Sequence, residues 1–180
     1  MAWYYISLGS NINPKHNVRR MLDGILQISE RIDLSRILET KAEGFKSNNT
    51  FFNLVARIYS PLSPIELKAC FNAIETQMGR DRNDPDKKKK DRAADIDILF
   101  TKVKAKESVA LEEIPTESYI QPFVLELLQF LQIPCIEKAS FDQEGVSFLY
   151  HNTLIGKTPL TLYRQEDSLQ QFSMPLKMAG

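Results

Sequence analysis

The fold of this chain is decided at residues 92–100, which have the sequence Arg92-Ala93-Ala94-Asp95-Ile96-Asp97-Ile98-Leu99-Phe100. The stretch alternates and is rich in isoleucine, a pattern typical of a β-strand. Residues two apart on a strand point to the same face, so the carboxylates of Asp95 and Asp97 are predicted to lie side by side, about 7 Å apart. Two like charges on one face of an apolar strand are costly unless a cation neutralises them. The pair is therefore a candidate metal site.

The chemistry of this pair points to magnesium and phosphate. Mg²⁺ prefers oxygen ligands such as carboxylates and usually completes its shell with water and substrate phosphates. A cationic stretch lies upstream, where Arg80, Arg82, the lysines at 87–90 and Arg92 could meet a polyphosphate. The alternatives are that the aspartates form the solvated face of an edge strand and the lysines a solvated loop. The flanking arginines favour metal-assisted phosphoryl chemistry.

The same strand closes a regular order of secondary structure. Ser63-Pro64-Ile65-Glu66 has the pattern of a helix start, with a serine N-cap, a proline in the first turn and a glutamate that completes a capping box. Gly79 is expected to end that helix. The expected elements are a strand at 3–8, a helix at 14–31, strands at 34–40 and 51–59, a helix at 64–79 and the strand at 92–100. This βαββαβ order predicts an α+β protein with a ferredoxin-like core and C-terminal additions.

Length and composition predict one domain with an appendage. The chain has 180 residues, of which 43% are hydrophobic, and this is enough for a single core. We expect residues 1–130 to form the ferredoxin-like domain and residues 131–180 to form an extension packed on it. A short apolar helix is expected at 123–131 and a strand at 146–150. The polar residues 151–180 are expected to be partly disordered.

Charge and cysteine content narrow the class of protein. The 23 basic and 23 acidic residues give a net charge of zero, which argues against a protein that coats nucleic acid. No apolar stretch approaches the length of a membrane span, and no basic leader with a cleavage site is evident. Cys70 and Cys135 form neither a disulfide framework nor a metal motif. We therefore expect a cytoplasmic protein without a nucleic-acid or membrane partner.

Four motifs, in the right order, resemble a known family. They are Gly9-Ser10-Asn11 after the first strand, Phe51-Phe52-Asn53 at the start of the third, Glu75 with Gly79-Arg80-Asp81-Arg82 at the end of the second helix, and residues 92–99. Together they resemble the 6-hydroxymethyl-7,8-dihydropterin pyrophosphokinases over most of residues 1–130. The resemblance implies a ferredoxin-like fold. It also implies transfer of the β,γ-pyrophosphoryl group of ATP to the hydroxymethyl group of the pterin, in folate biosynthesis, leaving AMP.

The resemblance implies roles at the phosphate end of the site. Asp95 and Asp97 would bind two Mg²⁺ ions that bridge the triphosphate and screen its charge. Arg92 and Arg82 would contact phosphates, because a guanidinium group can grip two phosphate oxygens at once. Arg80 would help to hold or release the nucleotide. The implied catalytic residues are Arg80, Arg92, Asp95 and Asp97.

The resemblance also implies which residues bind the two substrates, ATP and the pterin. The positions that match ATP-binding residues are Asn72, Glu75, Arg82 and Arg92. The positions that match pterin-binding residues are Thr40, Phe51, Asn53 and Phe123. The Asn53 amide offers both a donor and an acceptor to the ring edge, and aromatic faces stack on a flat ring at little entropic cost. With small molecules as its partners, the chain is expected to be a monomer or a weak dimer.

The loops around the expected site depart from the family pattern. They are residues 41–49, 81–91 and 116–122, and Lys90 and Asp91 stand where the family usually has small residues. Loops that close over a site exclude water and complete the catalytic set. Two functions of different class therefore remain: a working pyrophosphokinase, or a diverged relative that binds a pterin or nucleotide without efficient transfer, in a regulatory or interaction role. An RNA-binding ferredoxin-like domain is disfavoured by the zero net charge and the lack of a Lys/Arg-Gly-aromatic strand motif.

Overall fold

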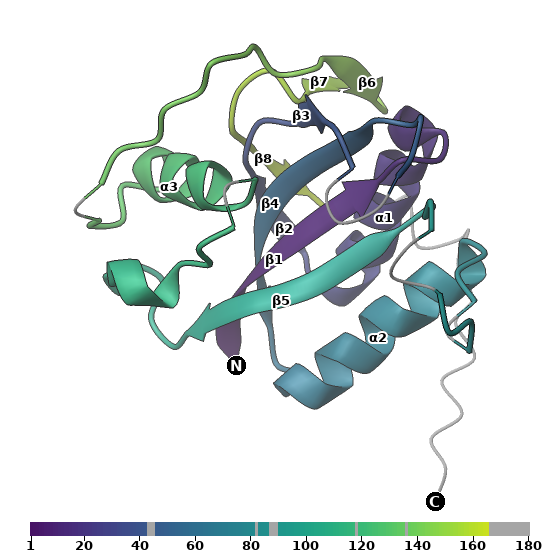
Figure 1. The fold of residues 1–180 in the computed structure, drawn as a ribbon. Helices are drawn as coiled ribbons and strands as arrows, with labels where there is room; N and C mark the ends of the chain where they lie inside the picture. Colours follow the sequence, from purple (N-terminus) through teal and green to yellow (C-terminus); the bar gives the residue numbers. More distant parts are fainter. Residues whose placement is uncertain (43–45, 82, 87–89, 118, 136, 166–180) are drawn as a thin grey trace, which may run out of the picture.

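An antiparallel sheet forms the centre of the computed structural model, which describes residues 1–42, 46–81, 83–86, 90–117, 119–135 and 137–165. Its strands are β1 (Ala2–Ser10), β2 (Arg31–Leu34), β3 (Leu38–Thr40), β4 (Phe51–Ser60), β5 (Asp95–Lys102) and β8 (Leu160–Tyr163). The strand order is β5-β1-β4-β2-β8, and β3 also pairs with β4 (Figure 1). All of these pairings are antiparallel. The predicted α+β class is confirmed.

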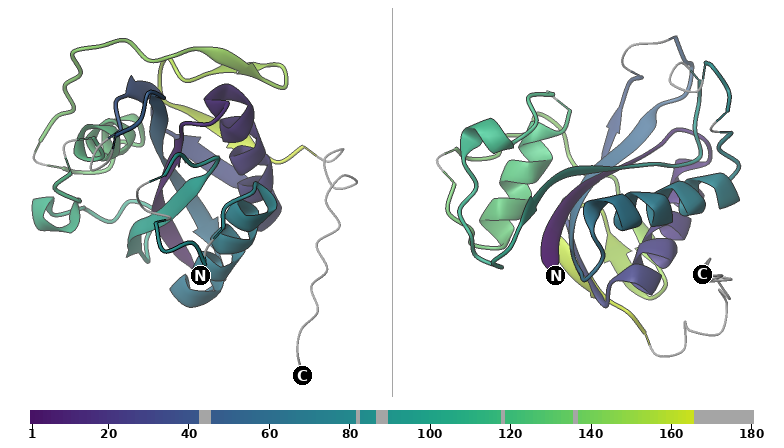
Figure 2. Two further views of the ribbon diagram at one scale, coloured as in Figure 1. Left: turned by 45° about the vertical axis from the view of Figure 1, so that its right-hand side comes forward. Right: turned by 90° about the horizontal axis from the view of Figure 1, so that it is seen from below.

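Helices cover both faces of this sheet. The helices α1 (Pro14–Ile28) and α2 (Pro64–Gln77) lie on one face, and α3 (Gln121–Phe130) lies on the other (Figures 1 and 2). A short 3₁₀ helix, η1 (Leu111–Glu113), precedes α3. Alternate residues of each strand therefore enter different cores: Leu8 and Leu54 pack with α1 and α2, whereas Tyr5 and Val55 pack with α3. The core beneath α3 borders the candidate functional site.

The ends of α2 agree with the prediction. The Ser63 hydroxyl accepts a hydrogen bond from the Glu66 N–H, and the Glu66 carboxylate accepts one from the Ser63 N–H at 2.8 Å, so the capping box is present. Beyond the helix, Gly79 has φ +94°, a left-handed conformation that glycine adopts without strain. The chain then turns back, and the Arg80 N–H donates to the Glu75 carbonyl at 3.0 Å. This turn directs the Arg80 side chain toward β5.

The second predicted strand, at 34–40, is wrong in its bounds. The structure has two shorter strands, β2 and β3, separated at Ser35, and α1 ends at Ile28 rather than at residue 31. The Ser35 N–H donates to the Val55 carbonyl at 2.9 Å, but the Val55 N–H donates to the Ser35 hydroxyl at 3.0 Å instead of to a carbonyl. The side chain thus replaces one bond of the ladder, and the strand is interrupted.

The described part of the C-terminal extension contains three strands. The strands β6 (Phe148–Tyr150) and β7 (Thr153–Ile155) form a hairpin, and β8 adds an edge strand to the main sheet beside β2. Leu162 of β8 reaches the core that α1 covers. Residues 166–180 lie outside the described residues, so the expectation of partial disorder in 151–180 stays a prediction. Within the described part, no helix is both long and apolar enough to cross a membrane.

Candidate functional site

A cavity of about 260 Å³ lies on the α3 side of the sheet, next to the first turn of α3. Its walls come from β1, β3, β4, β5 and α3. It is lined by Thr40, Phe51, Asn53, Arg92, Asp95, Asp97 and Phe123, all of which were predicted from the sequence as site residues. The structure therefore brings the residues predicted for the phosphates next to those predicted for the pterin.

The floor of the cavity is the backbone of β1 at Gly9. This residue lies directly opposite Asn53 on one side and Asp95 on the other, and it belongs to the strand rather than to the turn that the sequence suggested. A Cβ atom on Gly9 would lie only 2.9 Å from the Asn53 Oδ1 atom and 3.9 Å from the Asp95 Cβ atom. A side chain at this position would therefore have to displace the Asn53 amide.

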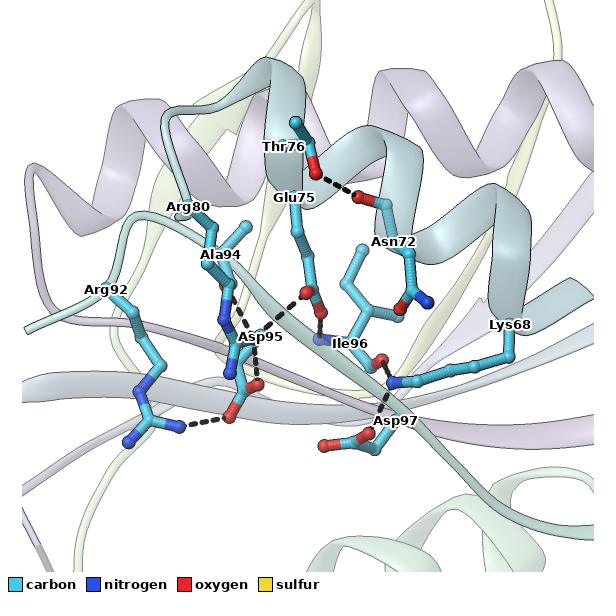
Figure 3. A network of polar contacts seen from close by, with 10 residues as sticks. All are labelled: Lys68, Asn72, Glu75, Thr76, Arg80, Arg92, Ala94, Asp95, Ile96 and Asp97. Atoms are coloured by element: carbon cyan, nitrogen blue, oxygen red, sulfur yellow. Dashed lines mark hydrogen bonds and ion pairs between the residues drawn. The ribbon is translucent and has the colours of Figure 1, made fainter. Parts of the chain in front are cut away.

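The two aspartates face the cavity from one side of β5, as the alternation predicted. Arg80 Nη1 donates a short hydrogen bond to Asp95 Oδ1, and Arg92 Nη1 lies 2.7 Å from Asp95 Oδ2. Lys68 Nζ lies 2.5 Å from Asp97 Oδ1 (Figure 3). Three cationic side chains thus neutralise the two carboxylates, as the cost of paired like charges requires.

Glu75 lies behind this strand rather than in the cavity. Its side chain is buried; Glu75 Oε1 accepts the Ile96 N–H at 2.8 Å, and Oε2 lies 3.0 Å from Arg80 Nη1 (Figure 3). Burial acts to lower the pKa of Arg80, but the charges of Asp95 and Glu75 and the hydrogen bond to Asp95 outweigh it and leave that pKa raised. Glu75 therefore ties α2 to β5 and holds a charged guanidinium group against Asp95.

Asn72 lies on α2, one helical turn before Glu75. Its Oδ1 atom is buried and accepts no hydrogen bond from the residues that the structure describes. An unsatisfied buried acceptor is costly, so a donor from a bound ligand would stabilise it. The remaining predicted phosphate contact, Arg82, lies outside the described residues.

The oxygen donors of the cavity suit a magnesium ion shared with phosphate. Both aspartates reach the cavity, and the Asp97 side chain is 57% exposed. Across the described ranges, no group of three or more histidine, cysteine or acidic side chains is placed to hold a metal ion. Two carboxylates with the remaining positions left to water and phosphates match the preference of Mg²⁺ rather than that of Zn²⁺.

Amide and aromatic groups line the other end of the cavity. Asn53 Nδ2 donates to Thr40 Oγ1 at 2.7 Å, which fixes the orientation of the amide. The Phe51 and Phe123 side chains are buried, and the guanidinium carbon of Arg92 lies 5.6 Å from the Phe51 ring centroid. Apolar walls with one fixed amide suit a flat heteroaromatic ring that carries donors and acceptors on its edge.

Some residues of the site were not predicted from the sequence. Lys68 could have been found, because it lies four residues before Asn72 and therefore on the same side of α2. Glu117 and Tyr119 line the cavity from the segment between η1 and α3. No periodic pattern relates that segment to the sheet, so its path could not be read from the residues alone.

The chain is similar to known enzymes over most of its length. The family model for 7,8-dihydro-6-hydroxymethylpterin-pyrophosphokinase (HPPK) matches residues 5–134. The 2-amino-4-hydroxy-6-hydroxymethyldihydropteridine pyrophosphokinase of Porphyromonas gingivalis is 35% identical over 117 residues, which are 64% of this chain and 80% of the relative. The enzyme of the same name from Bacillus subtilis is 30% identical over 149 residues, 79% of this chain and 87% of the relative. That of Aquifex aeolicus is 28% identical over 99% of this chain and all of the relative. This chain therefore belongs to the HPPK family.

Proposed function

We propose that this chain transfers pyrophosphate from ATP to the hydroxymethyl group of 6-hydroxymethyl-7,8-dihydropterin, a step of folate biosynthesis that leaves AMP. Membership of the HPPK family supports this activity. The observation that carries the proposal is the single cavity that joins the carboxylates of Asp95 and Asp97 to the amide of Asn53. A cavity with only one of these ends would suit only one of the two substrates.

The reaction needs an alcohol placed in line with a phosphorus atom. The pterin hydroxyl oxygen bonds to the β-phosphorus, the bond from that phosphorus to the bridging oxygen of the α-phosphate breaks, and AMP leaves with this oxygen while the hydroxyl proton passes to solvent. Such transfer depends on positioning and on stabilising charge. We propose Arg80 and Arg92 as catalytic residues, because their guanidinium groups already lie beside Asp95 and could grip phosphate oxygens.

We propose Asp95 and Asp97 as the ligands of Mg²⁺, with two ions as the family resemblance implies. Bound Mg²⁺ would supply charge screening for the polyphosphate and a lower pKa for the attacking hydroxyl. The side chains that neutralise the carboxylates in this structure are Lys68, Arg80 and Arg92. They lie where phosphate oxygens could accept their hydrogen bonds once the carboxylates bind metal.

For the pterin, we propose that Asn53 recognises the ring edge and that Phe51 and Phe123 contact the ring faces. The hydrogen bond from Asn53 to Thr40 supports this role, because a fixed amide can discriminate donors from acceptors. Thr40 is then a residue that orients Asn53 at the edge of the pocket.

For ATP, we propose that Asn72 accepts a hydrogen bond from the nucleotide, a role supported by its unsatisfied buried oxygen. The buried position of Glu75 favours an indirect role, in which it holds Arg80 toward the phosphates. Contact of Arg92 with phosphate is supported by its place in the cavity wall. The phosphate contact of Arg82 stays a prediction.

The strand order supports a ferredoxin-like core. The order β5-β1-β4-β2, with α1 and α2 on one face, is what a βαββαβ unit produces when β4 lies between β1 and β2. Because β8 extends the same sheet, we propose that residues 1–130 and the extension form one domain. The free thiols of Cys70 and Cys135 support a cytoplasmic location. A monomer or weak dimer stays a prediction.

The decisive experiment is an assay of AMP formation by the purified protein with ATP, Mg²⁺ and 6-hydroxymethyl-7,8-dihydropterin. We expect AMP to accumulate in step with the pterin pyrophosphate, and omission of the pterin serves as the control for simple ATP hydrolysis. Pterin binding without any AMP would contradict the proposal and would instead favour a diverged relative that binds without transfer.

A further inference from the structure

One carboxylate, that of Asp91, joins three segments that are far apart in the sequence. Asn11 Nδ2 donates to Asp91 Oδ1 at 2.6 Å, and the Ser47 hydroxyl donates to the same oxygen at 2.5 Å. Asn49 Nδ2 donates to Asp91 Oδ2 at 2.6 Å. Both oxygens are therefore used, and the donors come from the end of β1 and from the segment that leads into β4.

The partner on the β1 side is itself firmly held. Asn11 is only 3% exposed, and its Oδ1 atom accepts the Arg92 N–H at 2.7 Å. The Asn11 N–H in turn donates to the Arg92 carbonyl at 3.1 Å. These bonds fix the backbone beside Asp91, so its carboxylate has a defined position from which to hold Ser47 and Asn49.

Two of these three segments place a residue in the cavity. Arg92 follows Asp91 directly, and Phe51 follows Asn49 by two residues. The Arg92 guanidinium carbon lies 5.6 Å from the Phe51 ring centroid, and both residues line the cavity. The geometry points to a coupling between the Asp91 carboxylate and the relative placement of these two groups.

We propose that Asp91 is a positioning residue. It holds the segment of Ser47 and Asn49 against the Asn11 turn and so fixes the relative positions of Phe51 and Arg92 in the cavity wall. The role rests on the proposed function only in so far as the cavity binds the pterin. A carboxylate suits it because one group can accept from several donors and charge-assisted bonds are stronger than neutral ones.

The contacts of Asp91 contribute little to the core. Asp91 and Asn49 are exposed and Ser47 is half-buried, and none of the three belongs to a hydrophobic cluster. Loss of the carboxylate should therefore loosen the 46–50 segment and weaken pterin binding, while the rest of the fold stays intact. If Asp91 were purely structural, its loss would lower the stability of the protein more than it weakened pterin binding.

The test compares Asp91→Ala with a matched control, Asp86→Ala, which removes the same charge from the same loop at a carboxylate that accepts no hydrogen bond from the described residues. Hydrogen–deuterium exchange of residues 46–50 is measured in the free protein. Pterin affinity is measured by pterin fluorescence with Mg²⁺ and a non-hydrolysable ATP analogue. For Asp91→Ala we expect faster exchange, pterin affinity reduced by about tenfold and a melting temperature lowered by no more than about 2–4 °C. Asp86→Ala should match the wild type in all three.

A second pair of variants tests the proposed contact directly. If Ser47 acts through Asp91, then Ser47→Ala should weaken pterin binding on its own but add little to Asp91→Ala, because the two changes break the same bond. Wild-type exchange and affinity in Asp91→Ala, or fully additive effects in the double variant, would overturn the proposal. Neither readout needs turnover. A wild-type protein that forms no AMP would therefore refute the proposed function without deciding the role of Asp91.

Discussion

The α3 side of the sheet has two halves that are built from the same three strands but differ in chemistry. In one row across the sheet, Tyr5 of β1 stacks on Phe100 of β5 with ring centroids 4.3 Å apart, and this row belongs to the core that α3 covers. Four residues further along β1, the equivalent row is Asp95, Gly9 and Asn53. On β1 and β5 the side chains change from aromatic, at Tyr5 and Phe100, to absent or acidic, at Gly9 and Asp95, where the cavity replaces the helix. On β4 the first row holds the buried Arg57, which is ion-paired with Asp33, and the second row holds Asn53.

This difference shows that one face of a single sheet can carry both a packed core and a binding site. A strand residue faces a packed helix or a cavity according to its position along the strand, since side chains on one face recur every second residue. Changes in the row beneath α3 should mainly cost stability. Changes in the row beneath the cavity should mainly cost binding or turnover. Substitutions in each region can test that division.

Among the residues that line the cavity, Asp97 should show the largest effect. Replacement by asparagine removes the charge that a metal ion would need, and we expect turnover to fall by roughly 10³-fold or more. Stability should change by only about 0–1 kcal/mol, because the ion pair with Lys68 is largely exposed. The measurements are AMP formation and Mg²⁺ affinity by calorimetry in the presence of the ATP analogue. Asp97→Asn with wild-type turnover would show that the carboxylate does not bind the metal.

The core that covers the first row should show the reverse, for example at Leu127 of α3. Its side chain is fully buried, and Leu127→Ala should lower the free energy of unfolding by about 2–5 kcal/mol. Leu149→Ala, at a side chain that is 55% exposed, makes the same chemical change and serves as the control. Urea denaturation measures both. The division between the rows would fail if Leu127→Ala changed pterin affinity more strongly than stability.

Asn53 should show a smaller effect that separates the two ends of the cavity. Its replacement by alanine removes a neutral donor and acceptor, so pterin affinity should fall by roughly three- to tenfold while ATP affinity stays the same. Calorimetry with each ligand gives both values, and Thr40→Val should reproduce part of the effect because Thr40 orients the amide. A greater loss of ATP affinity would move Asn53 to the phosphate end.

Local patterns in the sequence predicted much of this arrangement. The capping box at Ser63 and the common face of Asp95 and Asp97 depend on neighbours in the chain, and the structure confirms both. The break at Ser35 could not be predicted, because it depends on a hydroxyl group that bonds to Val55 across the sheet.

Tertiary placement also limited what could be predicted for the site. The pairing of β1 with β5 shifts register between Tyr5 and Ile6, so Phe100, rather than Leu99, lies opposite Tyr5. Alternation continued from Asp97 would have placed Leu99 there. The buried position of Glu75 likewise depends on how α2 packs against β5. A motif within one segment cannot predict such packing.

The smallest expected effect concerns pH and the Asp91 contacts beside the cavity row. The hydrogen bond from Ser47, followed by those from Asn11 and Asn49, lowers the pKa of Asp91 in spite of some opposing burial. A lowered folded-state pKa stabilises the protein above the unfolded value of about 3.9 and loses that contribution as the pH falls through the folded value. The stability difference between the wild type and Asp91→Asn should thus be constant from about pH 7 to 5 and shrink below about pH 4. Urea denaturation of both proteins across this range isolates Asp91, because the other carboxylates titrate in both. A difference that did not change with pH would mean that the charge of Asp91 does not strengthen these bonds.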